Sequence, residues 1–492
     1  MRIGGESMLF MGIDVGSSGC KTSVMDETGR VICFASREYA FTYQDGRCEL
    51  DANVVWEKVS ETLRELGTNH DLKELKTVSV TSFGEMFVLL NEKKQVLAPS
   101  ISYEDTRGEE ELASLNEPDR LYRITGANPD VMFALPKLMW IKKHKPEVYA
   151  NARYLCMFAD YILFRMGAEH HTDYSLAART LMLDVTTKTW SKEILSMAEI
   201  HDALLGKLVA SGTKVGEMDA AIAEQAGLPK GILLLAGGHD QPCAALGAGI
   251  VASGDALDGM GSNECIVPAF GDLMIHQTMQ QSNLVCVPHI IPDLYVTYAF
   301  NRTAGSLLRW YHQIIGETDY QKVLNEMPEE PTELLVLPHF AGAATPYMDN
   351  TAVGGIVGLK LSTTRGMLTR GIIEGLNYEM LVNLHCLKDA GFSVQRLYVS
   401  GGMAKSGRIL QIKADVLGIP VMRLSNTETG TVGTAILGSV AMGLYPDCRT
   451  AAAALVKAES MFLPNQENHN YYQKQFKKYQ KMYQEQKELC QD

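Results

Sequence analysis

Glycine-rich segments carry the side chains that could take part in chemistry, and the first lies near residue 16. Gly16, Ser17 and Ser18 follow an apolar, strand-like run that contains Asp14. Small residues let main-chain N–H groups approach a phosphate, and serine hydroxyls add further donors. Lys21 would add positive charge, and the carboxylate of Asp14 could serve hydrated Mg²⁺. An ordinary tight hairpin with a turn aspartate fits the same pattern, so both interpretations stay open.

A second segment, Gly237 to Gln241, places a carboxylate directly after a buried strand. An apolar run over 231–236 stops at two glycines, and His239 and Asp240 follow. Ligands of α/β proteins usually bind at the carboxyl ends of such strands, where an aspartate can act as general base toward a hydroxyl. Asp240 could equally be the N-cap of a following helix. His239 is the more tempting catalyst by residue type, but an isolated histidine is more often structural.

Two further glycine turns lie in the second half of the chain. Gly261 and Ser262 separate two apolar runs and repeat, half a chain length later, the strand, Gly-Ser tip and strand of the first segment. Gly401 and Gly402 follow a strand signal over 396–399. Glycines at a strand end let a flat ligand such as adenosine lie against the main chain. A plain strand–helix connection is the alternative for this last turn.

The repeated hairpins indicate how the chain is organised. They predict two lobes, each opening with a glycine hairpin, with a boundary near residues 245–255. Apolar residues over 51–66 have the period of a helix. Aromatic residues also recur at helical spacing near the C-terminus, at Tyr472, Phe476, Tyr479 and Tyr483. This spacing predicts a final helix that lies on the second lobe.

Length and composition limit the classes of protein. The chain has 492 residues, of which 46% are hydrophobic and 21% charged, and its net charge is −13. An apolar fraction this high excludes a disordered chain, and the acidic balance disfavours a nucleic-acid partner. The ten cysteines lack metal-site spacing and are typical of reduced thiols, so we expect a soluble, cytoplasmic protein. The longest uncharged stretch, 429–446, is too short for a membrane span, and no membrane partner is expected.

Taken together and in order, the segments from about residue 10 to 445 resemble the FGGY carbohydrate kinase family, which includes xylulokinases, ribulokinases, gluconokinases and glycerol kinases. Glu264 stands where this family usually has a small or apolar residue. The motifs that carry the resemblance are GIDVGSSGCK (12–21), MFALPKLMWIKKH (132–144), GGHDQPCAALG (237–247), GMGSNE (259–264), GGIVGL (354–359), RGIIEG (370–375) and SGGMAKSGRILQIKADVLGIPV (400–421).

The resemblance implies an α/β fold of two actin-like, ribonuclease-H-like lobes with the active site in the cleft between them. The lobes would span 8–250 and 251–450, and a helical tail would span 451–492. Asp240 becomes the expected catalytic base, and Asp14 and Asp240 the groups near Mg²⁺. The residues implied for ATP binding are Asp14, Gly16, Ser17, Ser18, Lys21, Gly261, Ser262, Gly305, Gly401 and Gly402.

The family's sugar-contacting segments align with SFGEMF (82–87) and YEDTR (103–107). They imply that Glu85 and Asp105 accept hydrogen bonds from the acceptor sugar and that Gln241 donates one; surface charge is the alternative for Glu85. The expected reaction is transfer of the γ-phosphate of MgATP to a small sugar or polyol. A ketopentose such as xylulose leads, with a hexulose, gluconate or glycerol behind it. A non-catalytic nucleotide-binding protein and a phosphohydrolase stay as alternatives of other classes, and a homodimer is one open oligomeric state.

Overall fold

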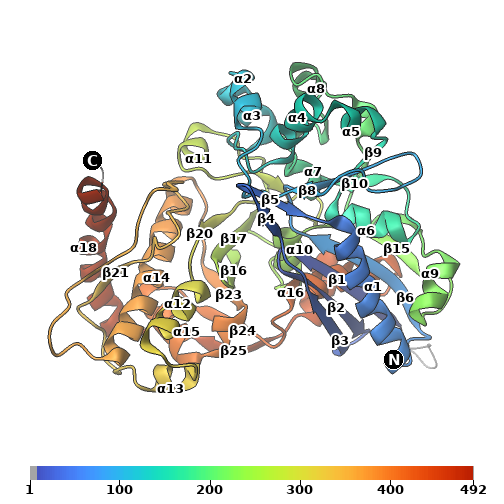
Figure 1. Cartoon of the computed structure of the whole chain (residues 1–492). Helices are drawn as coiled ribbons and strands as arrows, with labels where there is room; N and C mark the ends of the chain where they lie inside the picture. Colours follow the sequence, from blue (N-terminus) through green and yellow to red (C-terminus); the bar gives the residue numbers. More distant parts are fainter. Residues whose placement is uncertain (1–7, 491–492) are drawn as a thin grey trace.

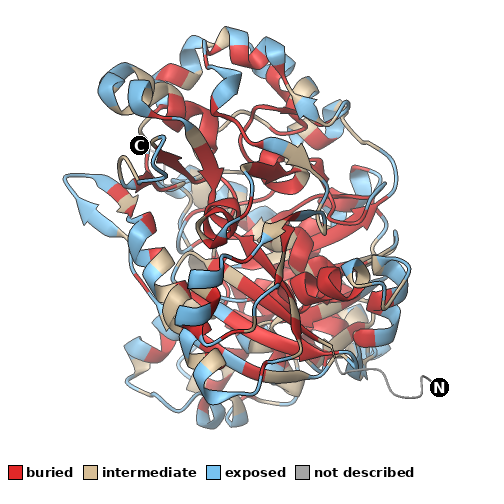
Figure 2. Cartoon of the chain, turned by 90° about the vertical axis from the view of Figure 1, so that its right-hand side faces the viewer, coloured by how far each residue is buried: buried red, intermediate tan, exposed pale blue. Residues whose placement is uncertain are grey.

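The structure is a computed structural model that describes residues 8–490. Two β-sheets lie side by side with helices between and around them, and a group of short helices covers the first sheet at one end (Figure 1). Buried residues fill the sheets and the inward faces of the helices, while exposed residues follow the outer turns (Figure 2). No helix within residues 8–490 is long and apolar enough to cross a membrane.

The first sheet has six strands in the order β14-β15-β6-β1-β2-β3. Strand β1 pairs antiparallel with β2, which confirms the predicted hairpin, and it pairs parallel with β6, which in turn is parallel to β15. Three strands therefore end at the same edge of the sheet. The strands are β1 (Leu9–Gly16), β2 (Gly19–Asp26), β3 (Val31–Glu38), β6 (Leu75–Ser82), β14 (Lys214–Glu217) and β15 (Leu233–His239).

The second sheet repeats this topology. Strand β16 pairs antiparallel with β17 and parallel with β23, and β23 is parallel to β24. The predicted duplication of a glycine hairpin is therefore also a duplication of the sheet around it. The strands are β16 (Asp255–Met260), β17 (Glu264–Phe270), β18 (Val287–Pro288), β19 (Tyr295–Val296), β20 (Ala299–Asn301), β23 (Arg396–Ser400), β24 (Val421–Leu424) and β25 (Ala458–Phe462).

Helices cover both faces of the first sheet. Helix α1 begins after Asp51, whose carboxylate caps the Asn53 N–H, and its buried face packs on β2 and β3, as the helical period over 51–66 predicts. Helix α6 lies against β6 and β15 on the same sheet. Helices α10 and α16 pack on each other and on the strands at the other side. The helices are α1 (Ala52–Asn69), α6 (Phe158–Met166), α10 (Asp240–Gly247) and α16 (Thr429–Ala441).

Helix α16 links the two halves of the chain. It comes late in the sequence, yet it packs on β1 and β6 of the first sheet (Figure 1). At its first turn, a Cβ on Gly430 would lie 2.9 Å from Oδ2 of Asp14, so a glycine here lets the helix approach this carboxylate closely. The division at residues 250 and 251 stays a sequence-based prediction, to which the structure adds this crossing.

The remaining helices surround the sheets. Those of the second half are α12 (Gly305–Ile315), α13 (Tyr320–Asn325), α14 (Arg365–Asp389), α15 (Gly407–Leu417) and α17 (Cys448–Leu455). Those of the group at the end of the first sheet are α2 (Glu109–Ser114), α3 (Pro118–Thr125), α4 (Ala134–His144), α5 (Pro146–Asn151) and α8 (Lys192–Met197).

The C-terminal segment holds the predicted helix together with a strand. Helix α18 (Gln466–Cys490) packs on α15 and on β21 (Leu335–Leu337), and Tyr472, Phe476 and Tyr479 are its buried aromatic residues. The sequence predicts a helical tail over 451–492; this segment also contains β25, which pairs with β24 and completes one edge of the second sheet. The aromatic spacing predicted the helix, whereas the short strand 458–462 has no comparable pattern.

Candidate active site

The edge where β1, β6 and β15 end brings the predicted carboxylates together. The registers place Asp14 opposite Thr81 of β6, and Thr81 opposite Gly238 of β15. Glu85 follows the end of β6, and Asp240 follows the end of β15. Because parallel strands end at a common edge, three segments far apart in the sequence converge there. Asp105 is hydrogen-bonded to Cys48 and Arg107 instead of to this group.

Asp240 is the first residue of α10, and its side chain is 30% exposed. Its Oδ1 atom is buried and has no hydrogen-bond partner among residues 8–490. The His239 Nε2 atom lies 3.0 Å from this oxygen, although the two are not aligned as a hydrogen bond. Burial raises the pKa of Asp240 well above its usual range, and Asp14 and Glu85 raise it further. A carboxylate with an open oxygen and raised proton affinity is suited to accept a proton.

Asp14 is a second carboxylate whose charge is poorly compensated. Burial raises its pKa to about 6, while Lys21 lowers it and Glu428 raises it. The Lys21 Nζ atom lies 2.7 Å from the Glu428 carboxylate at the start of α16, so its charge is already paired. Lys21 thus links the first hairpin to α16, and Glu428 is a neighbour of the site that sequence reasoning missed.

The tip of the first hairpin is formed by Gly16, Ser17 and Ser18. The Tyr39 hydroxyl donates to the Gly16 carbonyl at 2.5 Å, and the Tyr39 N–H donates to the Ser18 carbonyl. These bonds hold the hairpin by its carbonyl groups, and Ser18 is exposed at the tip. The arrangement fits a phosphate-binding turn, in which main-chain N–H groups and hydroxyls remain for a ligand.

A charged and aromatic cluster adjoins Asp240. Arg179 donates from Nε to Glu85 Oε1 at 2.7 Å, and its Nη2 lies 2.5 Å from the same oxygen. The Tyr298 hydroxyl lies 2.9 Å from His239 Nδ1. The positive charge of Arg179 opposes the rise in the pKa of Asp240. Sequence reasoning named Glu85 but missed Arg179 and Tyr298, because nothing in their local sequence connects them to Asp240.

Glu85 is held in an unusual backbone conformation. Its φ is +34°, a value that residues other than glycine rarely adopt. Such conformations cluster at functional sites, where the surrounding structure keeps them in place. Tyr103 lies close by: burial raises the pKa of its hydroxyl to about 12, and the charges of Glu85 and Asp240 contribute. The sugar-contacting segments predicted at 82–87 and 103–107 therefore meet at this edge.

Asp105 has its carboxylate fully engaged within the first half of the chain. It accepts hydrogen bonds from the Cys48 N–H and from three nitrogens of Arg107, which hold its pKa at about 2 despite its burial. An acceptor sugar would have to compete with these donors. Gln241, by contrast, follows Asp240 directly in α10 and is half-buried.

The second hairpin borders a pocket of about 450 Å³, large enough for a nucleoside. Its lining includes Met260 and four of the residues predicted to bind the nucleotide: Gly261, Ser262, Gly305 and Gly402. Gly401 has a φ of +91°, and a Cβ there would lie 2.5 Å from the Met260 carbonyl. A glycine is therefore required where β16 and β23 end side by side.

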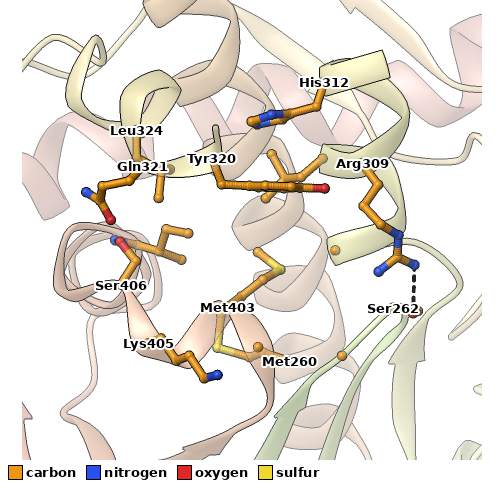
Figure 3. A pocket seen from close by; sticks show the side chains of 15 residues that line it. Met260, Ser262, Arg309, His312, Tyr320, Gln321, Leu324, Met403, Lys405 and Ser406 are labelled. Carbon is orange, nitrogen blue, oxygen red and sulfur yellow. Dashed lines mark hydrogen bonds between the residues drawn. The ribbon is translucent and has the colours of Figure 1, made fainter. Parts of the chain in front are cut away.

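Helices α12 and α13 supply the pocket residues that sequence reasoning missed. The Tyr320 ring stacks on His312 with centroids 4.0 Å apart and faces Met403 across the pocket (Figure 3). Arg309 donates from Nη2 to the Ser262 hydroxyl at 2.8 Å. Gly305, Arg309 and His312 recur at the spacing of one helix face, so a helix prediction over 305–315 could have found the last two.

The unusual Glu264 forms part of a buried charge cluster under the second hairpin. Lys413 of α15 places Nζ 2.5 Å from Glu264 and 2.8 Å from Asp258. Burial raises the pKa of Glu264 to about 7, and Lys413 opposes that rise. The lysine charge explains how this position, usually small or apolar in the resembled family, holds a carboxylate here.

Comparisons with known proteins agree with this geometry. The profile of the FGGY family of carbohydrate kinases matches residues 9–247 with its N-terminal domain and residues 271–442 with its C-terminal domain. A xylulose kinase of Staphylococcus epidermidis is 28% identical over 98% of each chain. A glycerol kinase of Chloroflexus aggregans is 27% identical over 88% of this chain and 90% of its own.

The fold is shared as well. The crystal structure of a "xyloylose kinase" from Brucella ovis superposes with a TM-score of 0.90, at 26% identity, and covers 98% of this chain and all of that one. The expected fold of two actin-like, ribonuclease-H-like lobes is thereby confirmed. The two matched domains together span most of the sequence. The chain belongs to the FGGY family of carbohydrate kinases and is a sugar phosphotransferase.

Proposed function

We propose that this protein transfers the γ-phosphate of ATP to a hydroxyl group of a small sugar, with a ketopentose such as xylulose as the leading acceptor and Asp240 as the base. The observation that carries the proposal is the open, buried Oδ1 atom of Asp240 at the edge where the first hairpin and the segment around Glu85 converge. Membership of a kinase family implies the nucleotide donor. The pocket beside Met403 offers space for its nucleoside.

The step follows from the placement of these groups. Asp240 accepts the proton as the sugar oxygen forms its bond to the γ-phosphorus and the bond to the β–γ bridging oxygen breaks, releasing ADP. Such transition states are loose, so positioning contributes more than proton removal. The two glycine hairpins would hold the phosphates through main-chain N–H groups, which explains how an acidic chain can bind a nucleotide.

The carboxylates at the edge suit a divalent cation. The negative charge of Asp14 raises the pKa of Asp240, and Oδ1 of Asp240 is open. Carboxylate oxygens are the donors that Mg²⁺ prefers, and one or two usually suffice beside water and substrate phosphates. Bound there, Mg²⁺ would neutralise charge on the β- and γ-phosphates. We therefore propose Asp14 and Asp240 as the residues that hold it, directly or through water.

The acceptor is the finer part of the proposal. Several relatives are xylulose kinases, which favours a ketopentose, while the glycerol kinase of similar identity keeps a polyol in the comparison. We propose Glu85 and Gln241 as groups that bind the acceptor, and Tyr103 with them; in support, the charges of Glu85 and Asp240 both act on the Tyr103 hydroxyl. We also propose a cytoplasmic location, since the ten cysteines, all within the described chain, are free thiols.

The test is a coupled assay of ADP release over pentuloses, hexuloses, aldonates and polyols. We expect the wild-type protein to release ADP only with an acceptor, and best with a ketopentose. Asp240→Asn should retain ATP binding, measured by calorimetry, and lose transfer by about 10²- to 10⁴-fold, the usual contribution of a general base.

The matched control is Asp26→Asn. Asp26 caps a turn at the opposite end of the first hairpin through bonds to Thr28 and Arg30, so this variant should keep its activity. Near wild-type transfer by Asp240→Asn would overturn the assignment of the base. Release of phosphate without any sugar would favour a phosphohydrolase instead, and ATP binding with neither reaction would favour a non-catalytic protein.

A further inference from the structure

Near Asp240, where β6 and β15 end, lies a guanidinium group with one open side. Arg179 is 5% exposed, and its Nη1 atom donates to no acceptor among residues 8–490. Its other two nitrogens are directed to a single oxygen of Glu85. A buried donor without a partner is rare in native proteins and calls for an explanation, such as a ligand that is bound in use.

Aromatic rings cover the faces of this guanidinium. Its central carbon lies 4.7 Å from the centroid of the Phe133 ring and 5.4 Å from that of Tyr298. With rings against the group and Glu85 on one edge, the remaining polar direction is that of Nη1. An arginine held in this way is fixed in orientation, because both its stacking and its ion pair restrict rotation.

The group is close to the proposed base. The side chain of Arg179 passes Gly84, where an added Cβ would lie 2.6 Å from its Cγ and 3.1 Å from the His239 ring. Tyr298 contacts both the guanidinium and His239, the residue before Asp240. A sugar whose hydroxyl reaches Asp240 therefore lies within the same small region as Arg179 and Glu85.

Resting on the proposed function, we infer that Arg179 binds an oxygen of the acceptor through Nη1, and that with Glu85 it selects an uncharged polyhydroxy acceptor over an aldonate. Both contacts from Arg179 go to Oε1 of Glu85, so Oε2 can accept a hydrogen bond from a hydroxyl group of the acceptor. One donor and one acceptor side by side match adjacent hydroxyls of a sugar, each of which can both donate and accept.

The charges explain the preference for a neutral acceptor. Asp14, Glu85 and Asp240 bring three carboxylates to this end of the cleft, and Arg179 is paired with one of them. Lys21 is paired with Glu428. Arg179 and Lys21, the cations that act on Asp240 and Asp14, each already have a carboxylate partner. An acceptor carboxylate would therefore add a further negative charge beside three carboxylates, and juxtaposed like charges are costly.

The experiment measures acceptor binding and turnover for Arg179→Met and Arg179→Lys. Binding of xylulose, ribulose, glycerol and gluconate is measured by calorimetry without nucleotide, and KM and kcat by ADP release. We expect Arg179→Met to raise Kd and KM for the best neutral acceptor by about 10- to 100-fold, the value of a hydrogen bond to a charged group, with KM for ATP unchanged. Arg179→Lys should restore part of the affinity, because it keeps the charge but not the geometry.

Deoxy analogues of the best acceptor provide the sharper readout. The wild-type protein should discriminate against the analogue that lacks the hydroxyl bound by Arg179, and this discrimination should disappear in Arg179→Met. If Arg179 had only a structural role, the substitution would weaken the binding of the acceptor and of its deoxy analogue equally. If Arg179→Met folds poorly, the double variant Glu85→Gln with Arg179→Met removes both charges together and is measured in the same way.

Arg37→Met is the control, since Arg37 pairs with Glu61 and Glu65 on the outer face of α1. Unchanged acceptor binding and unchanged discrimination in Arg179→Met, or tighter binding of gluconate than of every neutral acceptor, would overturn the inference. Sugar binding without transfer by the wild-type protein would overturn the proposed function and leave the binding readout of Arg179 intact. Binding of none of the sugars would overturn both.

Discussion

Two buried arginine–glutamate pairs in this protein differ in how completely they are bonded. The first is Arg179 with Glu85, near Asp240, and the second is Arg370 with Glu374, inside α14 of the second lobe. Arg179 leaves Nη1 open, and only one oxygen of Glu85 faces it. Arg370 uses all three nitrogens, donating to Glu374, to the carbonyls of 328 and 329, and to the Tyr472 hydroxyl.

The acid of the second pair is equally well bonded. Glu374 accepts from the Thr332 N–H and hydroxyl and from Tyr472 as well as from Arg370. Burial of charge is therefore common to both pairs and does not mark a functional site by itself. What distinguishes the cleft pair is its unfilled bonding capacity, which a ligand can complete. The same criterion separates Asp240, with an open oxygen, from Asp105, whose carboxylate is filled.

The largest effect that would test this comparison is expected from Arg370→Met. Removing one partner of a buried, fully bonded pair leaves an uncompensated charge, so the free energy of unfolding should fall by about 3–5 kcal/mol. Activity per folded molecule should stay at the wild-type value, because the pair touches no cleft residue. Urea unfolding and ADP release measure the two quantities. A stable variant that loses activity would break the comparison.

A second prediction concerns the pH dependence of stability at Asp14. Its pKa is about 6 in the folded protein against 3.8 in the unfolded chain, so the folded state binds the proton more tightly and this group's contribution to stability decreases as pH rises through that window. Asp14→Asn should therefore be more stable than the wild type by about 3 kcal/mol at pH 7 and by less than about 1 kcal/mol at pH 4.

Thermal unfolding of Asp14→Asn and the wild type at both pH values, without nucleotide or magnesium, measures this difference. The same variant should bind MgATP more weakly. A difference that does not change between pH 4 and pH 7 would show that the charge of Asp14 is already compensated in the folded protein, as that of Asp105 is.

The smallest effects are expected from two hydroxyls, one in each region. Tyr472→Phe removes a hydroxyl that bonds both Arg370 and Glu374, and should lower the free energy of unfolding by about 1–2 kcal/mol. Tyr298→Phe removes the partner of His239 and should cost about 1 kcal/mol or less, while it raises KM for the acceptor. If both variants lost the same free energy of unfolding and Tyr298→Phe left KM for the acceptor unchanged, the two arginine–glutamate pairs would not differ in function.

Sequence reasoning found those site residues whose signals are local. Asp14 lies in an apolar strand just before Gly16, and Asp240 follows an apolar strand that ends with two glycines. Both patterns depend only on neighbouring residues. The hairpins and α1 were predicted for the same reason. Arg179 could not be found in this way, because its partner Glu85 is 94 positions away and its own neighbours carry no pattern. The filled state of Asp105 depends likewise on Cys48, 57 positions away.

The sequence by itself determined the two glycine hairpins, the carboxylates that follow the strands, and the family to which the chain belongs. These follow from backbone freedom at glycine and from the alternation of apolar residues, which act over a few positions. Only the tertiary structure decided which charged groups have all their hydrogen bonds satisfied and which keep an unpaired atom. Hydrogen-bond satisfaction depends on partners that packing brings together from distant segments, and so Arg179 and Arg370 are distinguishable in space although both are arginines paired with a glutamate.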